Sequence, residues 1–468
     1  KMLWPCVRST FMRKRVKNIH FVGVGGSGMS GIAEVLVNLD YRVSGSDIAA
    51  GPVTRRLEEA GVTVNIGHDV AHISNADVVV VSSAIDRTNP EVAGALTARI
   101  PVIPRAEMLG ELMRFQQGIA VAGTHGKTST TSLLASILSQ GNLDPTFVIG
   151  GRINSMKANA KLGAGDIFVV EADESDASFL HLNPINTIVT NIDRDHLETY
   201  QGDFERLKAT YLDFIHQVPF YSNVFLCVDD DEINKIIPDI MRPIVTYGLS
   251  AQAQIQATSI VHFENKMNFV VHDKYYKKIK FDININLPGI HYVNNTLAAI
   301  AVGLEFGVSI KNIQKALRDF EGVSRRYDVY RGIYKNNKNF IVVDDYGHHP
   351  TEIRAVLEAT KKGFPNKEVA LVFQPHRYSR TKDCYEEFLS VFNIPQKLFL
   401  FDIYSAGEDH IPGISSEKLL KDIKRSNAYH LPNGKRANKI ILDNIAEDSI
   451  ILIMGAGSIG NFASQFIS

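Results

Sequence analysis

Short apolar runs alternate along the chain with longer mixed segments in which apolar residues recur at helical spacing. Most runs end in glycine, hydroxyl or acidic residues, a rhythm typical of parallel β-strands joined by helices. We therefore predict an α/β protein built of βαβ units. The predicted strands are 19–24, 42–46, 78–81, 119–122, 167–170, 187–189, 341–343, 369–373, 398–401 and 450–454. Sheets of this kind bind ligands beyond the carboxyl ends of their strands, so the residues after each run carry the candidate chemistry.

The most informative stretch is 118–132, which reads GIAVAGTHGKTSTTS. An apolar strand enters a glycine-rich turn, and hydroxyl residues then open a predicted helix that ends at Gly141. Glycines allow backbone N–H groups to face phosphate oxygens, while Lys127 supplies a cation and the Thr128 hydroxyl supplies a Mg²⁺ ligand. The stretch therefore predicts a nucleoside-triphosphate loop.

This loop departs from the usual pattern at one position. Val121 stands where G-x-x-x-x-G-K-[ST] has its first glycine, so the loop begins at Gly123 and is shorter. The alternative interpretation is a turn rich in glycine and threonine that binds no ligand.

A second glycine loop, GVGGSG at 23–28, follows the first predicted strand and precedes a predicted helix over 29–39. Asp47 lies close to the offset at which an acidic residue meets a ribose hydroxyl. Taken alone, the pattern indicates a dinucleotide-binding domain. It shows only that a phosphate fits the helix start, and the alternative is that the glycines serve tight packing.

Two acidic clusters follow strands of the same central region. The strand 167–170 leads to EADESD at 171–176, and the strand 187–189 leads to NIDRDH at 191–196. Acids past the ends of parallel strands lie beside the phosphate loop, where they can hold Mg²⁺ directly or through water. For each cluster the alternative is an ordinary acidic loop.

The final third of the chain is predicted to be a separate α/β unit. Its strands lead to DDYGHHP at 344–350, QPHRYSR at 374–380 and a further G-x-G-x-x-G at 455–460. Asp344, His348 and His349 are either a metal cluster or a hydrogen-bonded turn before a proline.

Length and composition limit the remaining possibilities. A chain of 468 residues predicts about three domains, and a net charge of -1 gives no general attraction to nucleic acid or to anionic membranes. Cys6, Cys227 and Cys384 lie far apart, which argues against a disulfide framework and favours a cytoplasmic protein. No apolar run approaches the roughly 18 residues of a membrane span.

Taken together, the motifs resemble the Mur ligase family of peptidoglycan synthesis, from about residue 17 to the C-terminus. The motifs that carry the resemblance are GTHGKT at 123–128, EADESD at 171–176, His291 with Asn295, GVSRRYD at 322–328, DDYGHHPTEI at 344–353 and QPHRYSRT at 374–381. The resemblance implies three domains: a Rossmann-like domain for the UDP sugar over 1–112, an ATPase domain over 113–322 and a Rossmann-like domain for the amino acid over 323–468.

The activity implied by the resemblance is ATP-dependent amide formation. The lactyl carboxylate of UDP-N-acetylmuramate attacks the γ-phosphate to give an acyl phosphate, which the amine of L-alanine opens. Two unit anions about 4 Å apart repel by about 4 kcal/mol at an effective dielectric near 20, so cations must line the reaction axis. We therefore expect ATP, Mg²⁺, UDP-N-acetylmuramate and L-alanine as ligands, no nucleic-acid or membrane partner, and a monomer or weak homodimer.

The resemblance also implies roles for individual residues. The expected catalytic residues are Lys127, Glu171, His196, Arg377, Arg380 and His348, with His376 as an alternative to His348 for the amine proton. The expected Mg²⁺ ligands are Thr128, Glu171 and His196. The expected ATP residues are Gly123, Thr124, His125, Gly126, Lys127, Thr128, Ser129, His291, Asn295, Arg326 and Asp345. The expected UDP-sugar residues are Gly25, Gly26, Ser27, Gly28, Ser46, Asp47, Ser82, Ser83 and His125.

Arg377 and Arg380 would share a helical face if their turn is helical, and suit the alanine carboxylate and the transferring phosphate. Tyr292 and Ser405 depart from the family pattern without removing a proposed phosphate or metal ligand.

Three other functions compete with this interpretation. A family member that attaches a whole tripeptide to the same UDP sugar has similar motifs, and Gly347 favours the enzyme that adds one amino acid. An NAD-dependent oxidoreductase would use the loop at 23–28 but leaves Lys127 and Glu171 unexplained. A non-catalytic nucleotide switch would bind ATP and release no phosphate.

Overall fold

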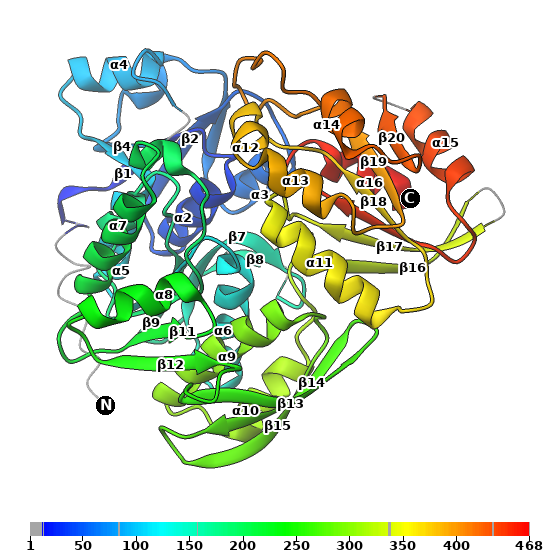
Figure 1. Cartoon of the computed structure of the whole chain (residues 1–468). Coiled ribbons are helices and arrows are strands. Elements are labelled where there is room, and N and C mark those ends of the chain that lie inside the picture. The colour runs from blue at the N-terminus through cyan, green and yellow to red at the C-terminus, as the bar shows by residue number, and fades with distance from the viewer. Residues whose placement is uncertain are drawn as a thin grey trace. The chain divides into compact units, whose positions relative to one another are not determined.

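The computed structural model describes residues 12, 14–82, 85–156, 158–335, 338–432 and 435–467. Two compact units form within the chain. The first unit comprises Lys1–Thr258, Val271–Phe281 and Asn294–Asp319, and the second comprises Ser259–Val270, Asp282–Val293 and Phe320–Ser468. Figure 1 follows the chain from blue to red. The predicted α/β class is confirmed, because helices alternate with largely parallel strands throughout.

The first unit begins with a five-stranded parallel sheet in the order β3-β2-β1-β4-β5, drawn in blue in Figure 1. Its strands are β1 Asn18–Val22, β2 Arg42–Asp47, β3 Thr63–Ile66, β4 Val78–Val81 and β5 Val102–Pro104. Its helices are α2 Ser27–Asn38, α3 Pro52–Glu59, η1 Val70–Ile73, α4 Pro90–Thr97 and α5 Arg105–Met113. The central strand β1 is almost wholly buried, which fixes the loop that follows it.

A second sheet of the same unit carries the predicted triphosphate loop. Seven of its strands lie in the order β12-β11-β10-β6-β9-β7-β8. They are β6 Gln117–Ala122, β7 Thr146–Ile153, β8 Ala158–Lys161, β9 Ile167–Glu171, β10 Asn186–Val189, β11 Val224–Cys227 and β12 Ile244–Gly248. Strand β6 pairs in parallel with β9 on one side and with β10 on the other. The acidic clusters after β9 and β10 therefore begin at the same sheet edge as the loop after β6.

The helices of this region are α6 Lys127–Gln140, η2 Ser178–His181, η3 Leu197–Tyr200, α7 Phe204–His216, α8 Asp231–Ile236, η4 Ile237–Asp239, α9 Ile290–Glu305 and α10 Ile310–Arg318. Residues 255–285 form the strands β13 Ile255–Phe263, β14 Lys266–Asp273 and β15 Ile279–Ile285. Residues 128–138 of α6 are buried. The triphosphate loop thus joins a buried strand to a buried helix, which leaves its backbone little freedom to move.

The second unit contains a six-stranded sheet in the order β16-β17-β21-β18-β19-β20. Its strands are β16 Asp328–Lys335, β17 Lys338–Asp345, β18 Val369–Phe373, β19 Lys397–Phe401, β20 Ala428–Leu431 and β21 Ile450–Met454. Its helices are α11 Pro350–Gly363, α12 Tyr378–Asp383, α13 Tyr385–Val391, α14 Ser416–Ile423, α15 Lys435–Asn444 and α16 Ile459–Ile467. Only β16 runs antiparallel to its neighbour among the described strands of this sheet.

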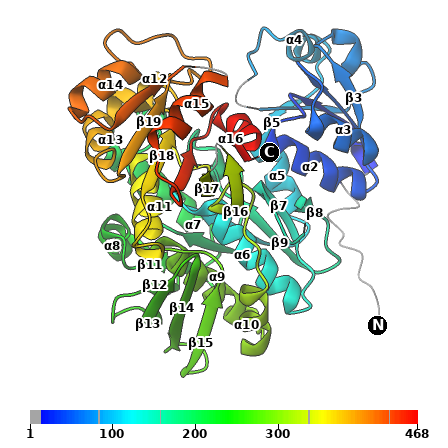
Figure 2. The same ribbon diagram turned by 90° about the vertical axis from the view of Figure 1, so that its right-hand side faces the viewer.

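Two helical layers cover this sheet (Figure 2). Helices α15 and α16 pack on one face with the apolar residues of β18, β19 and β21. On the other face, helix α13 contacts both α11 and α14. The polar segments that follow β17, β18 and β21 emerge at one edge, because these three strands are parallel.

The predicted strands 78–81, 369–373 and 450–454 have the predicted bounds, and the other predicted strands differ from the observed ones by a few residues at their ends. The helix α6 ends before Gly141, as predicted. The reason differs, however, because Gly141 has φ -75° instead of a left-handed conformation. A Cβ atom there would lie 2.7 Å from Val308 Cγ2, so close packing requires the glycine. Among the described residues, no helix combines the length and the apolar character needed to cross a membrane.

Candidate active site

The triphosphate loop between β6 and α6 has a backbone that only glycine adopts readily. Gly123 has φ 126° and Gly126 has φ 83°. A Cβ atom on Gly123 would lie 2.0 Å from Thr190 Oγ1, so the loop packs directly against the residues that follow β10. Thr190 Oγ1 donates to the carbonyl of His125 at 2.6 Å, and His125 N donates to Asn191 Oδ1 at 2.8 Å. The neighbouring strand end thus holds the loop in a concave conformation.

Lys127 is a largely buried cation at the start of α6. Its Nζ donates to the carbonyl oxygen of Gly123 at 2.7 Å, to that of Thr124 at 3.2 Å, and to Glu174 Oε2 at 2.6 Å. Burial alone would lower the pKa of Lys127, but the nearby carboxylates, Glu174 foremost, raise it. Lys127 therefore stays charged at neutral pH, which is the state that an anionic ligand requires.

The Thr128 hydroxyl and the Glu171 carboxylate lie side by side. Thr128 Oγ1 donates to Glu171 Oε2 at 3.1 Å, and Glu171 Oε1 accepts from Gly150 N at 2.8 Å. A hydroxyl and a carboxylate at the end of a parallel strand are the oxygen ligands that Mg²⁺ prefers. The structure thus brings together two of the three residues expected to bind the metal.

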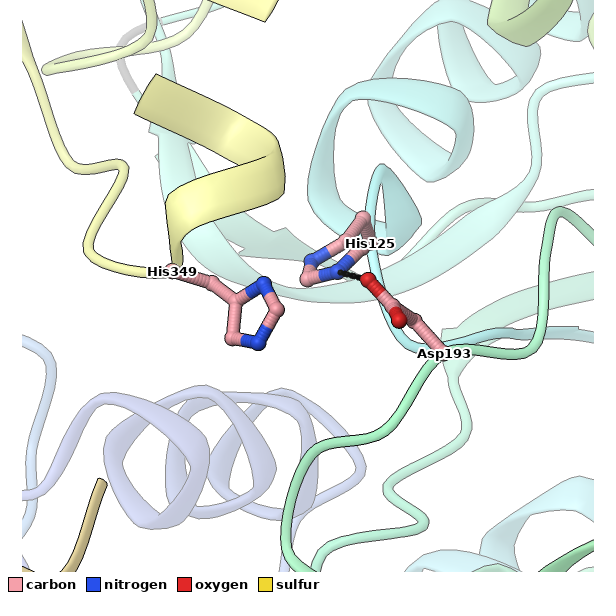
Figure 3. Close-up of side chains that lie close together, drawn as sticks. All are labelled: His125, Asp193 and His349. Atoms are coloured by element: carbon pink, nitrogen blue, oxygen red, sulfur yellow. Dashed lines mark hydrogen bonds and ion pairs between the residues drawn. The ribbon is translucent and has the colours of Figure 1, made fainter. Parts of the chain in front are cut away.

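Histidine and aspartate residues surround the opposite side of the loop. His125 Nε2 lies 2.9 Å from Asp193 Oδ2 (Figure 3), and Asp193 N donates to Thr124 Oγ1 at 2.9 Å. His196, the third expected Mg²⁺ ligand, has φ 55°, and its Nε2 lies 3.4 Å from Asp195 Oδ2. The expected ATP residue Asn295 also lies at the loop, since a Cβ atom on Gly126 would be 2.7 Å from Asn295 Oδ1. Ser129 is buried in the first turn of α6.

The first glycine loop is held by the acid predicted from its spacing. Gly25 N donates to Asp47 Oδ2 at 2.8 Å, and a Cβ atom on Gly25 would lie 2.7 Å from the same oxygen. Gly23 has φ 80°, and a Cβ atom on Gly28 would lie 2.8 Å from Arg105 Nη1. Asp47 therefore orders the loop itself, whatever further contact it makes with a ribose.

Ser46 lies beneath this loop and is fully buried. Its hydroxyl donates to Glu91 Oε2 at 2.5 Å, so in this structure the hydroxyl proton is used in a hydrogen bond within the protein. Ser82 ends the neighbouring strand, with its Oγ 3.8 Å from the Cβ position of Gly23. The expected residue Ser83 lies outside the described residues, and so does the side chain of Ser27.

Glu91 is a buried carboxylate surrounded by three imidazoles. His72 Nδ1 lies 2.7 Å and His20 Nε2 3.6 Å from Oε1, while His68 Nδ1 lies 3.0 Å from Oε2. Burial alone would raise the pKa of Glu91, but His20, Ser46, His72 and His68 together outweigh it and lower the pKa to about 2. This cluster ties α4 and the segment after β3 to the ends of β1 and β2. We refer to it as the Glu91 cluster.

In the second unit, Asp345 is buried at the end of β17. Its carboxylate accepts from Tyr327 N at 2.8 Å and from Gly347 N at 2.7 Å. Burial raises the pKa of Asp345 to about 6, although the positive charge of Arg326 opposes the shift. The Arg326 guanidinium carbon lies 5.1 Å from the centre of the Tyr346 ring. Arg326 is thus close enough to Asp345 to affect its charge.

The turn at 344–350 is a hydrogen-bonded turn. Arg325 Nε donates to both carboxylate oxygens of Asp344 at 3.3 Å, and His349 caps α11 by accepting from Thr351 N at 3.3 Å. His348 N donates to Glu352 Oε2 at 2.8 Å. A metal cluster of Asp344, His348 and His349 is not among the potential metal-binding groups of the described residues. These hydrogen bonds match the interpretation of the motif as a turn before a proline.

The two arginines after β18 do not share a helical face, and this expectation is wrong. Arg377 is the N-cap residue of α12, with φ 73°, whereas Arg380 lies inside the helix and is buried. Arg380 Nη1 lies 3.4 Å from His376 Nδ1, and the rings of His376 and His348 are 5.9 Å apart. The reason is local, since the left-handed backbone at Arg377 redirects its side chain before the helix begins.

His291 lies in the first turn of α9 and is partly buried. Burial lowers its pKa to about 4, so the ring is neutral at physiological pH. A neutral imidazole can accept or donate a hydrogen bond, which suits contact with an uncharged base.

Sequence reasoning missed three groups that the structure brings to these loops: Glu174, Asp193 and the Glu91 cluster. Glu174 and Asp193 lie inside the motifs EADESD and NIDRDH, and their partners Lys127 and His125 were expected site residues, but the sequence did not show that these residues pair. Nothing in the local pattern around Glu91 indicates three histidine neighbours, because these come from β1 and from the segment after β3.

Comparisons with known proteins agree with this architecture. The family model "Mur ligase family, catalytic domain" matches residues 18–117, "Mur ligase middle domain" matches 121–303, and "Mur ligase, glutamate ligase domain" matches 325–457. The UDP-N-acetylmuramate–L-alanine ligase of Hydrogenovibrio crunogenus is 50% identical over 97% of this chain and 99% of its own length. That of Psychrobacter arcticus is 46% identical over 97% of this chain and 94% of its own length.

A solved structure resembles the whole chain as well. The crystal structure of UDP-N-acetylmuramate-alanine ligase from Thermotoga maritima has a TM-score of 0.79 and 27% sequence identity, and the match covers 96% of this chain and 98% of that chain. Three matched domains in order, relatives of near-equal length and a phosphate loop flanked by acids at one sheet edge lead to the same conclusion: this chain belongs to the Mur ligase family.

Proposed function

We propose that the chain joins L-alanine to the lactyl carboxylate of UDP-N-acetylmuramate at the expense of ATP, through an acyl phosphate, in peptidoglycan precursor synthesis. The observation that carries this proposal is the set of Lys127, Thr128 and Glu171 at one sheet edge. The relatives that share about half of the sequence are named for this ligation.

The residues of the triphosphate loop fit ATP and Mg²⁺. The positive φ of Gly123 and Gly126 and their close contacts with Thr190 and Asn295 require glycine at both positions, and Thr128 with Glu171 offers oxygen ligands to a hard cation. When bound, Mg²⁺ would neutralise charge on the phosphates. Lys127 contributes a second, permanent positive charge. This charge would offset part of the repulsion between the phosphates and an approaching carboxylate.

Other residues orient the two remaining substrates. The loop at 23–28, ordered by Asp47, is suited to the diphosphate of the UDP sugar, and His125 with Asp193 lies beside the loop that receives ATP. In the second unit, Arg377 and Arg380 suit the carboxylate of alanine, and His348 or His376 would take the amine proton. By the family resemblance, His196 would bind Mg²⁺, and His291, Asn295, Arg326 and Asp345 would contact ATP.

By the family resemblance, Gly347 favours single addition of alanine over addition of a tripeptide. A Cβ atom at this position would lie 2.8 Å from both Asp345 Oδ1 and Met454 Cε, so the turn beside Asp345 is built for glycine. Relatives named for the tripeptide reaction would therefore need a different turn if they carry alanine there.

The test is phosphate release from ATP with Mg²⁺ and UDP-N-acetylmuramate, with each amino acid or the tripeptide added in turn. We expect release only when both the sugar nucleotide and L-alanine are present, and an amide product of matching mass. Release driven by the tripeptide would support the recycling reaction instead. Binding of ATP without any release would indicate a nucleotide switch, and NADH binding would indicate the oxidoreductase.

A further inference from the structure

A buried glutamate that the proposed reaction does not use lies directly against the triphosphate loop. The side chain of Glu174 is 2% exposed, and its Oε2 accepts from Lys127 Nζ at 2.6 Å. The backbone of Glu174 is also anchored, because its carbonyl accepts from the Tyr200 hydroxyl and from Ala177 N. The anchored backbone of the loop after β9 therefore fixes the position of the carboxylate beside Lys127.

This contact uses the last donor of the Lys127 ammonium. An ammonium group has three N–H donors, and the carbonyls of Gly123 and Thr124 accept the other two. In this arrangement Lys127 is directed into its own loop. To donate to a phosphate oxygen, it has to give up one of these acceptors, and a neutral carbonyl within the loop cannot be displaced without moving the backbone.

The charges of the groups indicate which of the three acceptors of Lys127 a phosphate oxygen would replace. A triphosphate and the Glu174 carboxylate are both anions and compete for the same cation, and Asp173 adds a further negative charge beside them. We propose that Glu174 is a positioning residue: it is the resident counter-ion of Lys127, which the phosphates of ATP replace, and it thereby limits the affinity for ATP. This inference rests on the proposed ATP site.

The groups that face Glu174 support an exchange of this kind. They are Lys127 from α6, Asp173 from the same loop, Tyr200 from η3, and Tyr211 from α7, whose pKa is raised by burial and by Glu174. Burial raises the pKa of Glu174 to about 7, although Lys127 opposes the shift. A protonated Glu174 no longer competes with the phosphates, so affinity for ATP should increase as the pH falls through this value.

The test is the dissociation constant of Mg·ATP, measured by calorimetry for wild type, E174Q, E198Q and K127A between pH 6 and pH 8. E174Q keeps the shape of the side chain and removes its charge. E198Q is the matched control, because Glu198 is exposed on η3 and its change removes the same charge from the same region. Thermal unfolding of each variant verifies that it is folded.

We expect E174Q to bind Mg·ATP about fivefold to tenfold more tightly than wild type at pH 8, with a matching fall in KM for ATP, and E198Q to bind like wild type. Wild-type affinity should weaken from pH 6 to pH 8, while that of E174Q should change less. A purely structural role would instead lower both the thermal stability and the ATP affinity of E174Q.

Unchanged or weaker ATP binding by E174Q, or equal pH dependence in E174Q and wild type, would overturn the role of Glu174. The wild-type pH series provides this test even if E174Q does not fold, since affinity that is constant from pH 6 to pH 8 contradicts the exchange. Failure of the ATP site itself has a different signature, in which K127A binds Mg·ATP as tightly as wild type.

Discussion

The first unit contains two glycine loops in the same strand-to-helix setting with different side chains around them. Both join a buried parallel strand to a helix, at residues 23–28 and 123–128. The first loop is ordered by an anion, Asp47, and rests on the Glu91 cluster. The second contains a cation, Lys127, with the pair Thr128 and Glu171 beside it.

The difference teaches that one strand-to-helix motif can carry side chains of opposite charge, so the backbone motif alone does not identify the chemistry of a loop. A loop with backbone donors and a fixed acid can hold a diphosphate in place. Transfer of a phosphoryl group also requires positive charge where negative charge accumulates, and under the proposed function Lys127 with a divalent ion would provide it. We therefore expect substitutions at the second loop to affect turnover, and substitutions at the first to affect binding and stability.

The largest effect is expected for Lys127→Ala. Removal of the permanent charge should lower kcat by about 10³-fold, which corresponds to about 4 kcal/mol of transition-state stabilisation. Steady-state phosphate release measures it, and Lys161→Ala is the control, since Lys161 forms an exposed pair with Asp144 in the same unit. Comparable turnover in the two variants would remove the functional distinction between the loops.

A smaller loss of turnover is expected for Glu171→Gln. The amide keeps the contact with Thr128 but is a weaker ligand for a hard cation, so kcat should fall by about 10²-fold and half-saturation should need more Mg²⁺. A Mg²⁺ titration of phosphate release measures both. If the Mg²⁺ requirement is the same in the variant and in wild type, Glu171 does not bind the metal.

At the first loop, Glu91→Gln should act on stability. Glu91 has a pKa of about 2 in the folded protein, below the ordinary value of 4.5, so it stabilises the fold above pH 4.5 and loses this contribution as the pH falls toward 2. We expect the variant to lose about 2–3 kcal/mol at pH 7, measured by urea unfolding. The difference between wild type and variant should shrink below pH 4, and a difference that stays constant would contradict the charge of Glu91 as its cause.

The smallest effect is expected for Asp47→Asn. The amide can still accept from Gly25 N but carries no charge, so the loop should be less firmly ordered. KM for UDP-N-acetylmuramate should rise by about tenfold, equivalent to about 1.4 kcal/mol, with kcat nearly unchanged. Kinetics with the sugar nucleotide as the varied substrate measure this, and a fall in kcat without a change in KM would assign Asp47 to the chemical step.

The predictions from the sequence were most accurate where a local pattern has one structural solution. Runs such as Val78–Val81 and Ile450–Met454 are short, apolar and bounded by polar residues, and they form the predicted strands. The Gly-Lys-Thr turn had to follow a buried strand and open a helix, which it does at β6 and α6. The boundaries at 112/113 and 322/323 and the roles of the individual site residues remain predictions.

Local patterns were less informative for contacts between distant segments. The expected shared face of Arg377 and Arg380 is wrong because one left-handed residue precedes α12, and helical spacing does not reveal where a helix begins. Gly141 ends its helix for a reason, contact with Val308, that lies far along the chain.

By itself the sequence determined the α/β class, the positions of the ten predicted strands, and the two glycine loops between a strand and a helix, because each depends on neighbours in the chain. Only the tertiary structure decided which ionisable side chains pair with one another. It directs Lys127 to Glu174 and surrounds Glu91 with His20, His68 and His72. The physical reason is that burial and electrostatic pairing depend on distance in space, which is set when β-strands from different parts of the chain align in one sheet.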